Sequence, residues 1–324
     1  MTDPAGVPYF AVELQPPDIQ PWMGGNTGVP GFTTFGSSQP GPHVALVALL
    51  HGNEIAGAVV LDRMMRAGIR PRRGSLTLGF ANLAAFARWD PQHPTASRFL
   101  DEDMNRVWDP AVLDGPRRSS ELDRARDLRP VMDTVDVLLD LHSMLWPSDP
   151  LILCGPTPRG LALASSLGVP GLVVADIGHI TGPRLIDYAR FTRDGGTSTA
   201  CLVEAGQHWQ PGTVTVTQAC VDALLRRTGL ADAPAPDAAA PDAPAPDALP
   251  GVRRAEVTTT VTAATGGFTF LQSFRGGDVV PRRNTLIALD GTAEIRTPHD
   301  DCLLVMPSLR PSRGHTAVRL ARFL

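Results

Sequence analysis

The chain has 324 residues, of which 43% are hydrophobic, so it is long enough for two domains and apolar enough to bury a core. Its 29 basic and 33 acidic residues give a formal net charge of −4, which argues against nucleic acid or an anionic membrane as the main partner. All of the Lys+Arg total is arginine, so the chain has no Schiff-base lysine, no P-loop lysine and no kinase lysine.

The first half of the chain alternates short apolar runs with helical patterns. The aliphatic run Val44–Leu50 predicts a buried strand, and residues 55–67 predict a helix with one apolar face. Further strands are predicted at 75–80, 135–141, 151–154, 171–175 and 200–203, with a helix at 213–228. Strands that alternate with helices predict an α/β fold with a mostly parallel, mixed sheet flanked by helices.

A change in composition separates this part from the rest. Residues 231–250 contain only Ala, Pro, Asp and one Leu, so they have nothing to build a core and their prolines prevent a continuous helix. We predict a linker here, between an α/β domain at 1–230 and a second domain at 251–324. In the second domain, β-type runs at 257–261, 268–274, 285–289 and 302–306 predict a small all-β fold.

The cysteines and the amino-terminal segment favour a cytoplasmic protein. The four cysteines form no CxxC pair and no disulfide pattern. The first arginine is Arg63, so the segment before it lacks the positive charge of a signal peptide. Because the longest aliphatic run is also too short to cross a bilayer, we expect no membrane partner.

Two motifs at predicted strand ends suggest a metal site. His51-Gly52-Asn53-Glu54 follows the first aliphatic strand, and His142 follows the strand at 135–141. Ligands gather at the carboxyl ends of strands in open α/β sheets, and two imidazoles with one carboxylate suit a catalytic Zn²⁺, here one per chain. Asp140 is expected on the same face as His142, where it would orient the imidazole. Alternatively, the tetrapeptide is a chance match and each histidine is a hydrogen-bonded loop residue.

A charged segment at 98–106 is the next candidate. Arg98 and Arg106 have the side chain that binds carboxylates with two parallel hydrogen bonds, and Asn105 adds a neutral donor. The alternative is a solvated loop whose arginines pair with the acidic residues 101–103. Composition alone favours that alternative.

Together these motifs resemble the succinylglutamate desuccinylase/aspartoacylase family, a branch of the zinc carboxypeptidase-like hydrolases. The resemblance rests on four pieces in the family's order: HGNE at 51–54, RxxxxDxNR at 98–106, DLH at 140–142 and VEAG at 203–206. It spans most of residues 43–210 and implies a carboxypeptidase-like α/β fold with a small β domain at the carboxyl end.

The resemblance also implies residue roles. Zinc would be bound by His51, Glu54 and His142. The scissile carbonyl would be polarised by Arg98, and a substrate carboxylate would be held by Asn105 and Arg106. The general base would be Glu204, although a salt bridge or a place beside a helix cap is an alternative reading of that residue. Two further substrate contacts in the family have Tyr188 and Arg193 as plausible counterparts here, at a looser spacing, and His208 has no assured role.

The function implied by the resemblance is zinc-dependent hydrolysis of a linear amide C–N bond. The substrate would be a small N-acyl amino acid, cleaved to a carboxylate and a free amino acid. One alternative is a zinc carboxypeptidase-like enzyme that acts on short peptides, and another is a binding module with a structural metal. The acyl group, the amino acid and the oligomeric state stay open at this point.

Overall fold

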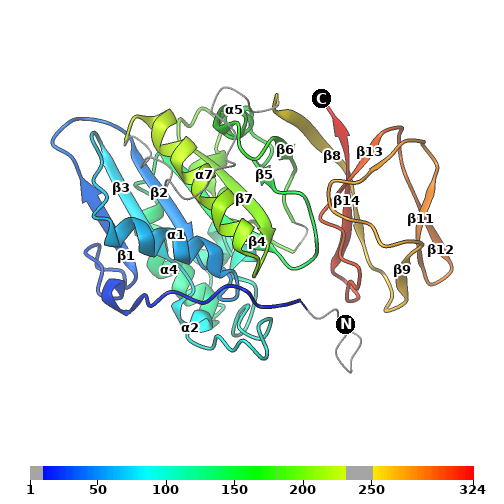
Figure 1. Cartoon of the computed structure of the whole chain (residues 1–324), viewed down its shortest axis with the longest axis horizontal. Helices are drawn as coiled ribbons and strands as arrows, with labels where there is room; N and C mark the ends of the chain where they lie inside the picture. The colour runs from blue at the N-terminus through cyan, green and yellow to red at the C-terminus, as the bar shows by residue number, and fades with distance from the viewer. Residues whose placement is uncertain (1–9, 180, 231–250) are drawn as a thin grey trace.

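The structure is a computed structural model that describes residues 10–179, 181–230 and 251–324. The predicted linker at 231–250 lies outside the described residues. Figure 1 shows a large sheet flanked by helices, with a smaller sheet at the carboxyl-terminal end of the molecule. In the described part of the chain, no helix is both long enough and apolar enough to span a membrane.

The large sheet is mixed, as predicted. Its strands from the first part of the chain are β1 (Phe32–Gly36), β2 (His43–Ala48), β3 (Ser75–Phe80), β4 (Val137–Met144), β5 (Leu151–Leu153), β6 (Leu172–Ala175) and β7 (Thr199–Gln207). They are ordered β1-β3-β2-β4-β7-β5-β6. The central strands β3, β2, β4 and β7 run parallel, whereas β1 and β5 are antiparallel to β3 and β7.

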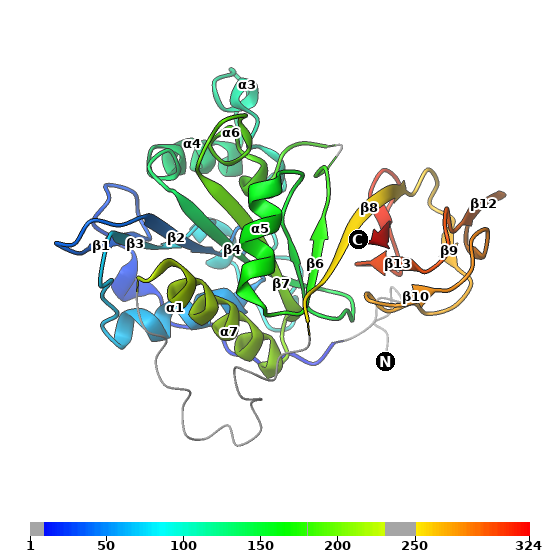
Figure 2. The ribbon, with the colours of Figure 1, turned by 90° about the horizontal axis from the view of Figure 1, so that it is seen from above.

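Helices cover both faces of this sheet. They are η1 (Gln20–Trp22), α1 (Ile55–Arg66), α2 (Leu83–Phe86), η2 (Met104–Arg106), α3 (Pro110–Leu113), α4 (Ser120–Met132), α5 (Pro158–Leu167), η3 (Leu185–Asp187), α6 (Ala189–Thr192) and α7 (Pro211–Thr228). One hydrophobic core joins α1, α5 and α7 to one face of the sheet, and a second joins α4 and α6 to the other. Figure 2 shows α1 and α7 on one side of the sheet and α3, α4 and α6 on the other.

Several helix ends follow ordinary capping signals, whereas the start of α1 at the site does not. Ser119 Oγ accepts a hydrogen bond from the backbone N–H of Leu122 at the start of α4, 3.0 Å away. Helix α5 ends at Gly168, whose φ of 72° suits glycine. Glu54 occupies the N-cap position of α1, yet its side chain accepts no capping hydrogen bond. Its carboxylate is therefore free to face the histidines described below.

Two strands are longer than their apolar runs predict. Strand β4 continues through His142 to Met144, and β7 continues through Glu204 to Gln207. Both polar residues therefore lie within strands rather than just after them. The apolar pattern stops early because these positions face a polar cavity, while the backbone ladder pairs His142 with Glu204 and continues beyond them.

The carboxyl-terminal region is all-β, as predicted, but part of it continues the large sheet. Its strands are β8 (Arg253–Thr262), β9 (Phe268–Phe270), β10 (Val279–Val280), β11 (Leu286–Asp290), β12 (Ala293–Arg296), β13 (Cys302–Val305) and β14 (Thr316–Phe323). Strand β8 pairs in parallel with β6, and β14, β13 and β10 follow it, which gives an eleven-stranded sheet within the described residues. Strands β12, β11 and β9 form the separate small antiparallel sheet. The division into two domains at residue 251 stays a prediction.

Candidate metal centre and active site

Two neighbouring parallel strands bring two histidines together. Strand β2 pairs with β4 up to the Ala48–Leu141 register, and the His51–Glu54 turn follows β2 where His142 extends β4. The carboxyl ends of parallel strands share one edge of the sheet, so the imidazoles meet there. The backbone N–H of Gly52 donates to the carbonyl of Arg98, 3.1 Å away, and thereby ties the turn to the charged segment.

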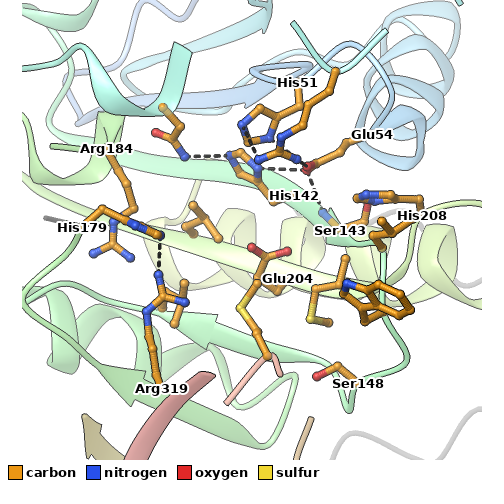
Figure 3. Close-up of a pocket in the computed structure, with 18 of the residues that line it drawn as sticks. His51, Glu54, His142, Ser143, Ser148, His179, Arg184, Glu204, His208 and Arg319 are labelled. Atoms are coloured by element: carbon orange, nitrogen blue, oxygen red, sulfur yellow. Dashed lines mark hydrogen bonds and ion pairs between the residues drawn. The ribbon is translucent and has the colours of Figure 1, made fainter. Parts of the chain in front are cut away.

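The carboxylate of Glu54 lies between the two imidazoles (Figure 3). Its Oε1 is 2.7 Å from His51 Nδ1, and its Oε2 is 2.9 Å from His142 Nδ1. The backbone N–H of Ser143 also donates to Oε2, at 3.0 Å. All three side chains of the triad are buried, and one donor atom from each lies within 4.8 Å of the others. The three residues predicted as metal ligands therefore converge.

Each imidazole places its other nitrogen beside an aspartate. His142 Nε2 is 2.9 Å from Asp140 Oδ2, and His51 Nε2 is 2.9 Å from Asp103 Oδ1. The place predicted for Asp140 matches this geometry. Asp103 was missed as a partner of His51, because the composition of a charged loop does not reveal which of its acidic side chains point into the protein. Carboxylates behind metal-binding histidines set the tautomer and raise ligand basicity.

Charge within the triad favours a cation. Burial alone would raise the pKa of Glu54, but the charges of His51 and His142 outweigh burial and hold that pKa well below its usual range. Burial alone would lower the pKa of His142, but Asp140 and Glu54 outweigh it and raise that pKa well above its usual value. The zinc-free site thus favours a protonated His142 at the point where the three donor atoms converge. Metal binding at a site of this type releases such a proton, because the ligand nitrogen must be unprotonated. Two imidazole nitrogens with one carboxylate fit zinc.

We expect Asp103→Asn to weaken metal binding by about 10- to 100-fold, because the amide cannot supply the negative charge behind His51. Asp101→Asn is the matched control, since Asp101 instead accepts hydrogen bonds from Ser120 at 2.6 and 2.7 Å, away from the histidines. Competition with a chromophoric zinc chelator measures both affinities. Equal affinities for the two variants would contradict a role of Asp103 at the metal centre.

Gly52 is required by the packing of the turn. A Cβ at this position would lie 2.4 Å from the backbone N of Phe86 and 2.5 Å from the carbonyl oxygen of Ser97. We expect Gly52→Ala to lower the free energy of unfolding by about 1–3 kcal/mol and to weaken metal binding, because the turn must shift. Gly212→Ala is the control, since nothing lies within 4 Å of a Cβ there. Thermal melting with and without zinc tests this, and wild-type behaviour of Gly52→Ala would refute it.

Glu204 faces the triad from the adjacent strand β7. It is 7% exposed, and its Oε2 has no hydrogen-bond partner among the described residues. Burial, assisted by the negative charge of Glu54, raises the pKa of Glu204 to about 8 against the smaller opposing effects of His142 and Arg98. A carboxyl group with a raised pKa and a free oxygen beside candidate metal ligands is suited to accept and return protons. The alternative role in a salt bridge finds no support, since no ion pair involves Glu204 in the described part of the chain.

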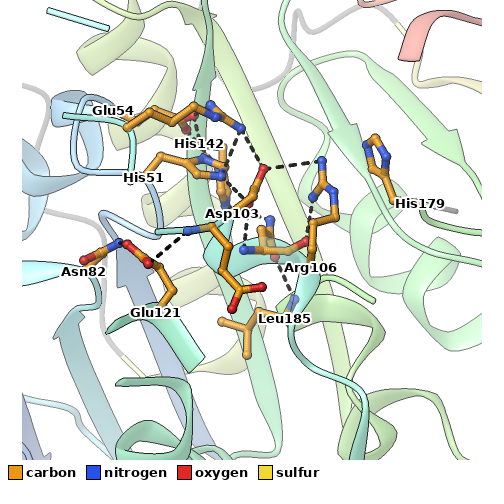
Figure 4. Close-up of polar contacts among 12 residues, drawn as sticks. His51, Glu54, Asn82, Asp103, Arg106, Glu121, His142, His179 and Leu185 are labelled. Atoms are coloured by element: carbon orange, nitrogen blue, oxygen red, sulfur yellow. Dashed lines mark hydrogen bonds and ion pairs between the residues drawn. The ribbon is translucent and has the colours of Figure 1, made fainter. Parts of the chain in front are cut away.

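The charged segment at 98–106 is anchored to the core and is not a solvated loop. Glu121 of α4 is fully buried and accepts N–H groups from Leu100, Asp101 and Glu102 at 2.6, 3.0 and 3.2 Å. Asn82, which lies beside Glu121 in Figure 4, also donates to it, at 3.0 Å. A carboxylate in the core thereby holds the backbone that carries Arg98, Asn105 and Arg106.

A cavity of about 150 Å³ connects these groups. Seven of the residues predicted as site residues line this cavity: His51, Glu54, Arg98, Asn105, Arg106, His142 and Glu204. Arg98 contacts both Glu54 Oε1 at 3.1 Å and His51 Nε2 at 3.0 Å. Asn105 Oδ1 accepts from the backbone N–H of Leu185 at 2.8 Å, so its orientation is determined by η3.

Two predicted substrate contacts are not brought to the cavity. Tyr188 donates its hydroxyl proton to Asp133, 2.7 Å away, and packs in the core beneath α4. Arg193 is exposed, and its carbonyl accepts from Arg159. Neither lines the cavity, since the bond to Asp133 holds Tyr188 elsewhere and Arg193 lies at the exposed end of α6. Their only sequence support was that a Tyr and an Arg precede Glu204, as in the family, and the spacing to Glu204 is looser than the family pattern.

Other cavity residues were missed by the sequence reasoning, and His208 is now placed. The missed residues include Ser143, His179, Arg184 and Arg319, and none of these four belongs to a motif that the sequence sets apart. His208 is 2% exposed and its Nδ1 lies 2.7 Å from Ser143 Oγ. Burial lowers the pKa of His208 to about 4, so its imidazole is neutral near pH 7.

Comparison with known proteins identifies the family. The family model for the succinylglutamate desuccinylase/aspartoacylase catalytic domain matches residues 40–226, which is more than half of the chain. The chain belongs to this family. Succinylglutamate desuccinylase/aspartoacylase proteins are deacylases of the hydrolase class, which agrees with the motifs at 51–54, 98–106, 140–142 and 203–206. No curated protein matches the sequence.

Three solved structures share the fold of this chain. The succinylglutamate desuccinylase from Vibrio cholerae matches with a TM-score of 0.67 and 15% identity over 90% of this chain and 85% of that chain. A succinylglutamate desuccinylase/aspartoacylase from Rhodobacter sphaeroides matches with a TM-score of 0.65 and 18% identity over 90% and 88%. The product-bound ectoine utilization protein EutE (DoeB) from Ruegeria pomeroyi matches with a TM-score of 0.62 and 16% identity over 90% and 88%. At these identities the likeness shows the fold.

Proposed function

We propose that this protein is a zinc-dependent amidohydrolase that cleaves an N-acyl amino acid into a carboxylate and a free amino acid. The observation that carries the proposal is the convergence of His51, Glu54 and His142 at the wall of a cavity where Glu204 has an unpaired carboxyl oxygen. Membership of a deacylase family supports the same reaction class.

Zinc would be held by the two Nδ1 atoms and the Glu54 carboxylate, with Asp103 and Asp140 orienting the imidazoles. When bound, it supplies Lewis-acid activation of water and of the amide carbonyl. Proton transfer and the stabilisation of negative charge would be carried out by side chains of the protein.

Glu204 is the proton carrier in this scheme. Its carboxylate takes a proton from the attacking water and returns it to the departing amine nitrogen. The water oxygen first bonds to the acyl carbon, and the C–N bond breaks when the resulting tetrahedral adduct collapses. The OH of water thus ends in the carboxylic acid, and its other hydrogen ends on the amine. The burial that raises the pKa of Glu204 also makes its carboxylate a stronger base.

Arg98 and Arg106 would stabilise negative charge on the substrate. Arg98 lies beside the triad and would donate N–H groups to the oxyanion that develops on the scissile carbonyl, an interaction worth roughly 3–4 kcal/mol for one donor. Arg106 also lines the cavity and would bind a carboxylate of the substrate, together with Asn105, whose Nδ2 lies 3.4 Å from His142 Nε2.

A substrate screen tests the reaction class. The zinc-loaded chain is assayed against N-acyl amino acids that differ in acyl length and charge, and against dipeptides, with the chelator-treated chain as control. We expect zinc-dependent release of a free amino acid from at least one N-acyl amino acid. Cleavage of dipeptides alone would favour the carboxypeptidase-like alternative. A zinc-loaded chain that hydrolyses neither class would refute the proposed function.

A further inference from the structure

His208 is a buried histidine that lies outside the four family motifs. It follows the last residue of β7, and its backbone N–H donates to the carbonyl of Met144 at 2.9 Å. Between Glu204 and Gln207, β7 advances three residues while β4 advances two, from His142 to Met144. This bulge brings His208 beside the end of β4, and bulges next to active sites often re-aim a side chain.

The imidazole of His208 is held from two sides. Its Nδ1 lies 2.7 Å from the hydroxyl oxygen of Ser143 (Figure 3), and its ring packs against that of Trp209 with centroids 5.4 Å apart. The indole N–H of Trp209 donates to the carbonyl of Asn53, 3.3 Å away, in the turn between two of the candidate metal ligands. The ring orientation is therefore tied to the candidate metal centre.

The hydrogen bond to Ser143 selects one tautomer of His208. The Ser143 side chain is buried, and its hydroxyl has no other hydrogen-bond partner among the described residues. If Nδ1 carried the imidazole proton, the serine hydroxyl would have no acceptor for its own proton, and a buried hydroxyl without an acceptor is costly. The serine therefore donates to Nδ1, which leaves the imidazole proton on Nε2.

The Nε2 atom is the end of the His208 ring that is available to a ligand. It makes no hydrogen bond within the described part of the chain, and it is not one of the fully enclosed unpaired atoms. The ring lines the cavity, so Nε2 reaches that space. Burial lowers the pKa of His208 to about 4, so the Nε2–H group is an uncharged donor near pH 7.

The contact between Ser143 and His208 does not match a nucleophilic serine and its base. In such a pair, a third group orients the imidazole through its second nitrogen. No side chain contacts Nε2 of His208 in the ranges that the structure describes. The pair therefore presents an N–H donor to the cavity.

His208 and Arg98 approach the triad from opposite oxygens of Glu54. Oε1 of Glu54 accepts from Arg98 at 3.1 Å, whereas Oε2 accepts from the backbone N–H of Ser143 at 3.0 Å. His208 is bonded to Ser143 and therefore lies on the Oε2 side. In the proposed reaction the scissile amide lies at the triad, and the carbonyl oxygen is the atom of an amide group that accepts hydrogen bonds.

We propose that His208 is a further catalytic residue, whose Nε2–H donates to the carbonyl oxygen of the scissile amide while Ser143 holds the ring in the donor tautomer. This inference rests on the proposed function, and it adds a neutral donor to the cationic donor Arg98. Negative charge develops on the carbonyl oxygen as water adds to the acyl carbon, so a fixed donor stabilises the transition state more than the substrate. Loss of the donor should therefore lower kcat and change KM little.

Two substitutions separate this role from a structural one. An asparagine amide matches the Nδ1 position of histidine and a glutamine amide matches the Nε2 position, because the two side chains differ in length by one carbon. His208→Asn should keep the bond to Ser143 but lose the donor, so we expect kcat to fall by about 10²- to 10³-fold. His208→Gln should keep an N–H group at the Nε2 position and recover part of that loss. A purely structural bond to Ser143 would give the opposite order.

The control variant removes a comparable histidine elsewhere. His299 is also buried and bonds a hydroxyl, Thr258 Oγ1 at 3.0 Å, but it does not line the cavity. His299→Asn should keep the wild-type kcat with the same N-acyl amino acid. Zinc affinity and melting temperature of the two His208 variants should stay close to the wild type, which shows that the metal centre and the fold are intact.

The tautomer is measured without turnover. NMR of isotope-labelled histidine side chains distinguishes a protonated Nε2 from a protonated Nδ1, and the His208 variants assign the signal. We expect a protonated Nε2 in the wild type. Ser143→Ala, which leaves His208 in place, should give a mixture of tautomers and a lower kcat, whereas Ser143→Thr keeps the hydroxyl and should retain the single form. A protonated Nδ1 in the wild type would overturn the inference.

Kinetics and NMR together distinguish failure of this inference from failure of the proposed function. Wild-type kcat in a folded, zinc-binding His208→Asn enzyme would overturn the inference and leave the function standing, as would a change confined to KM. A larger loss of kcat in His208→Gln than in His208→Asn would assign a structural role to His208 and overturn the inference in the same way. A wild type that has the Nε2–H tautomer but hydrolyses no N-acyl amino acid would refute the function, and with it the catalytic assignment.

Discussion

Glu204→Gln should lower kcat by about 10²- to 10⁴-fold while zinc binding is retained, because the amide has the shape of the carboxylate but accepts no proton. Glu204 lies on β7 beside the triad and makes no ion pair in the described residues, so the substitution removes a proton acceptor without breaking a salt bridge. Steady-state kinetics and metal analysis on the same preparation provide the two measurements. Turnover within a few-fold of the wild type would remove Glu204 from the reaction.

The pH dependence of stability shows whether the Glu204→Gln variant is correctly folded. In the zinc-free chain, the folded state raises the pKa of Glu204 from 4.5 to about 8. Between these values the folded state holds a proton that the unfolded chain has released, so ionisation of Glu204 reduces stability as pH rises. Glu204→Gln removes this pH dependence. The melting temperature of the variant minus that of the wild type should therefore increase as pH rises from 5 to about 8. A loss of activity without misfolding would thus be recognised.

His142→Ala should abolish the stabilisation that zinc gives to the folded chain. A ligand that binds only the folded state contributes about 2.7 kcal/mol at 100 times its dissociation constant, so zinc should raise the wild-type melting temperature clearly. The variant lacks one of three donors and leaves Glu54 and Asp140 buried without His142, so its zinc-free form should lose about 3–5 kcal/mol.

His299→Ala is the matched control for this result. His299 is also buried, but it contacts Thr258 in the carboxyl-terminal region, away from the triad. Its variant should keep the zinc-dependent rise in melting temperature that His142→Ala loses. Differential scanning calorimetry with and without zinc measures both. A zinc-dependent rise that survives in His142→Ala would contradict the metal centre.

Much of the central site was predictable because it depends on local rules. Parallel strands end at a common edge, so the motifs after β2 and within β4 were expected to meet. Strand alternation placed Asp140 beside His142. The resemblance at residues 203–206 singled out Glu204. Each of these inferences uses residues within a few positions of one strand.

The rest of the site depends on contacts between distant segments. Asp103 turns inward because Glu121 holds the backbone of its loop, and no sequence pattern connects these two residues. Arg319 reaches the cavity only because β8 pairs with β6 across the segment at 231–250 and β14 follows β8 in the large sheet. Tyr188 and Arg193 show the converse, since a resemblance with loose spacing assigned them to a cavity that they do not line.

The parallel ladder between β6 and β8 limits how this protein can be shortened or recombined. Residues Leu172–Ala175 pair with Arg253–Glu256 in register, so β6 is an interior strand only while the carboxyl-terminal region is present. A chain truncated after residue 230 would expose the hydrogen-bonding groups of β6, and an open strand edge of this kind promotes aggregation. Chimeras that exchange this region between relatives would have to preserve that register.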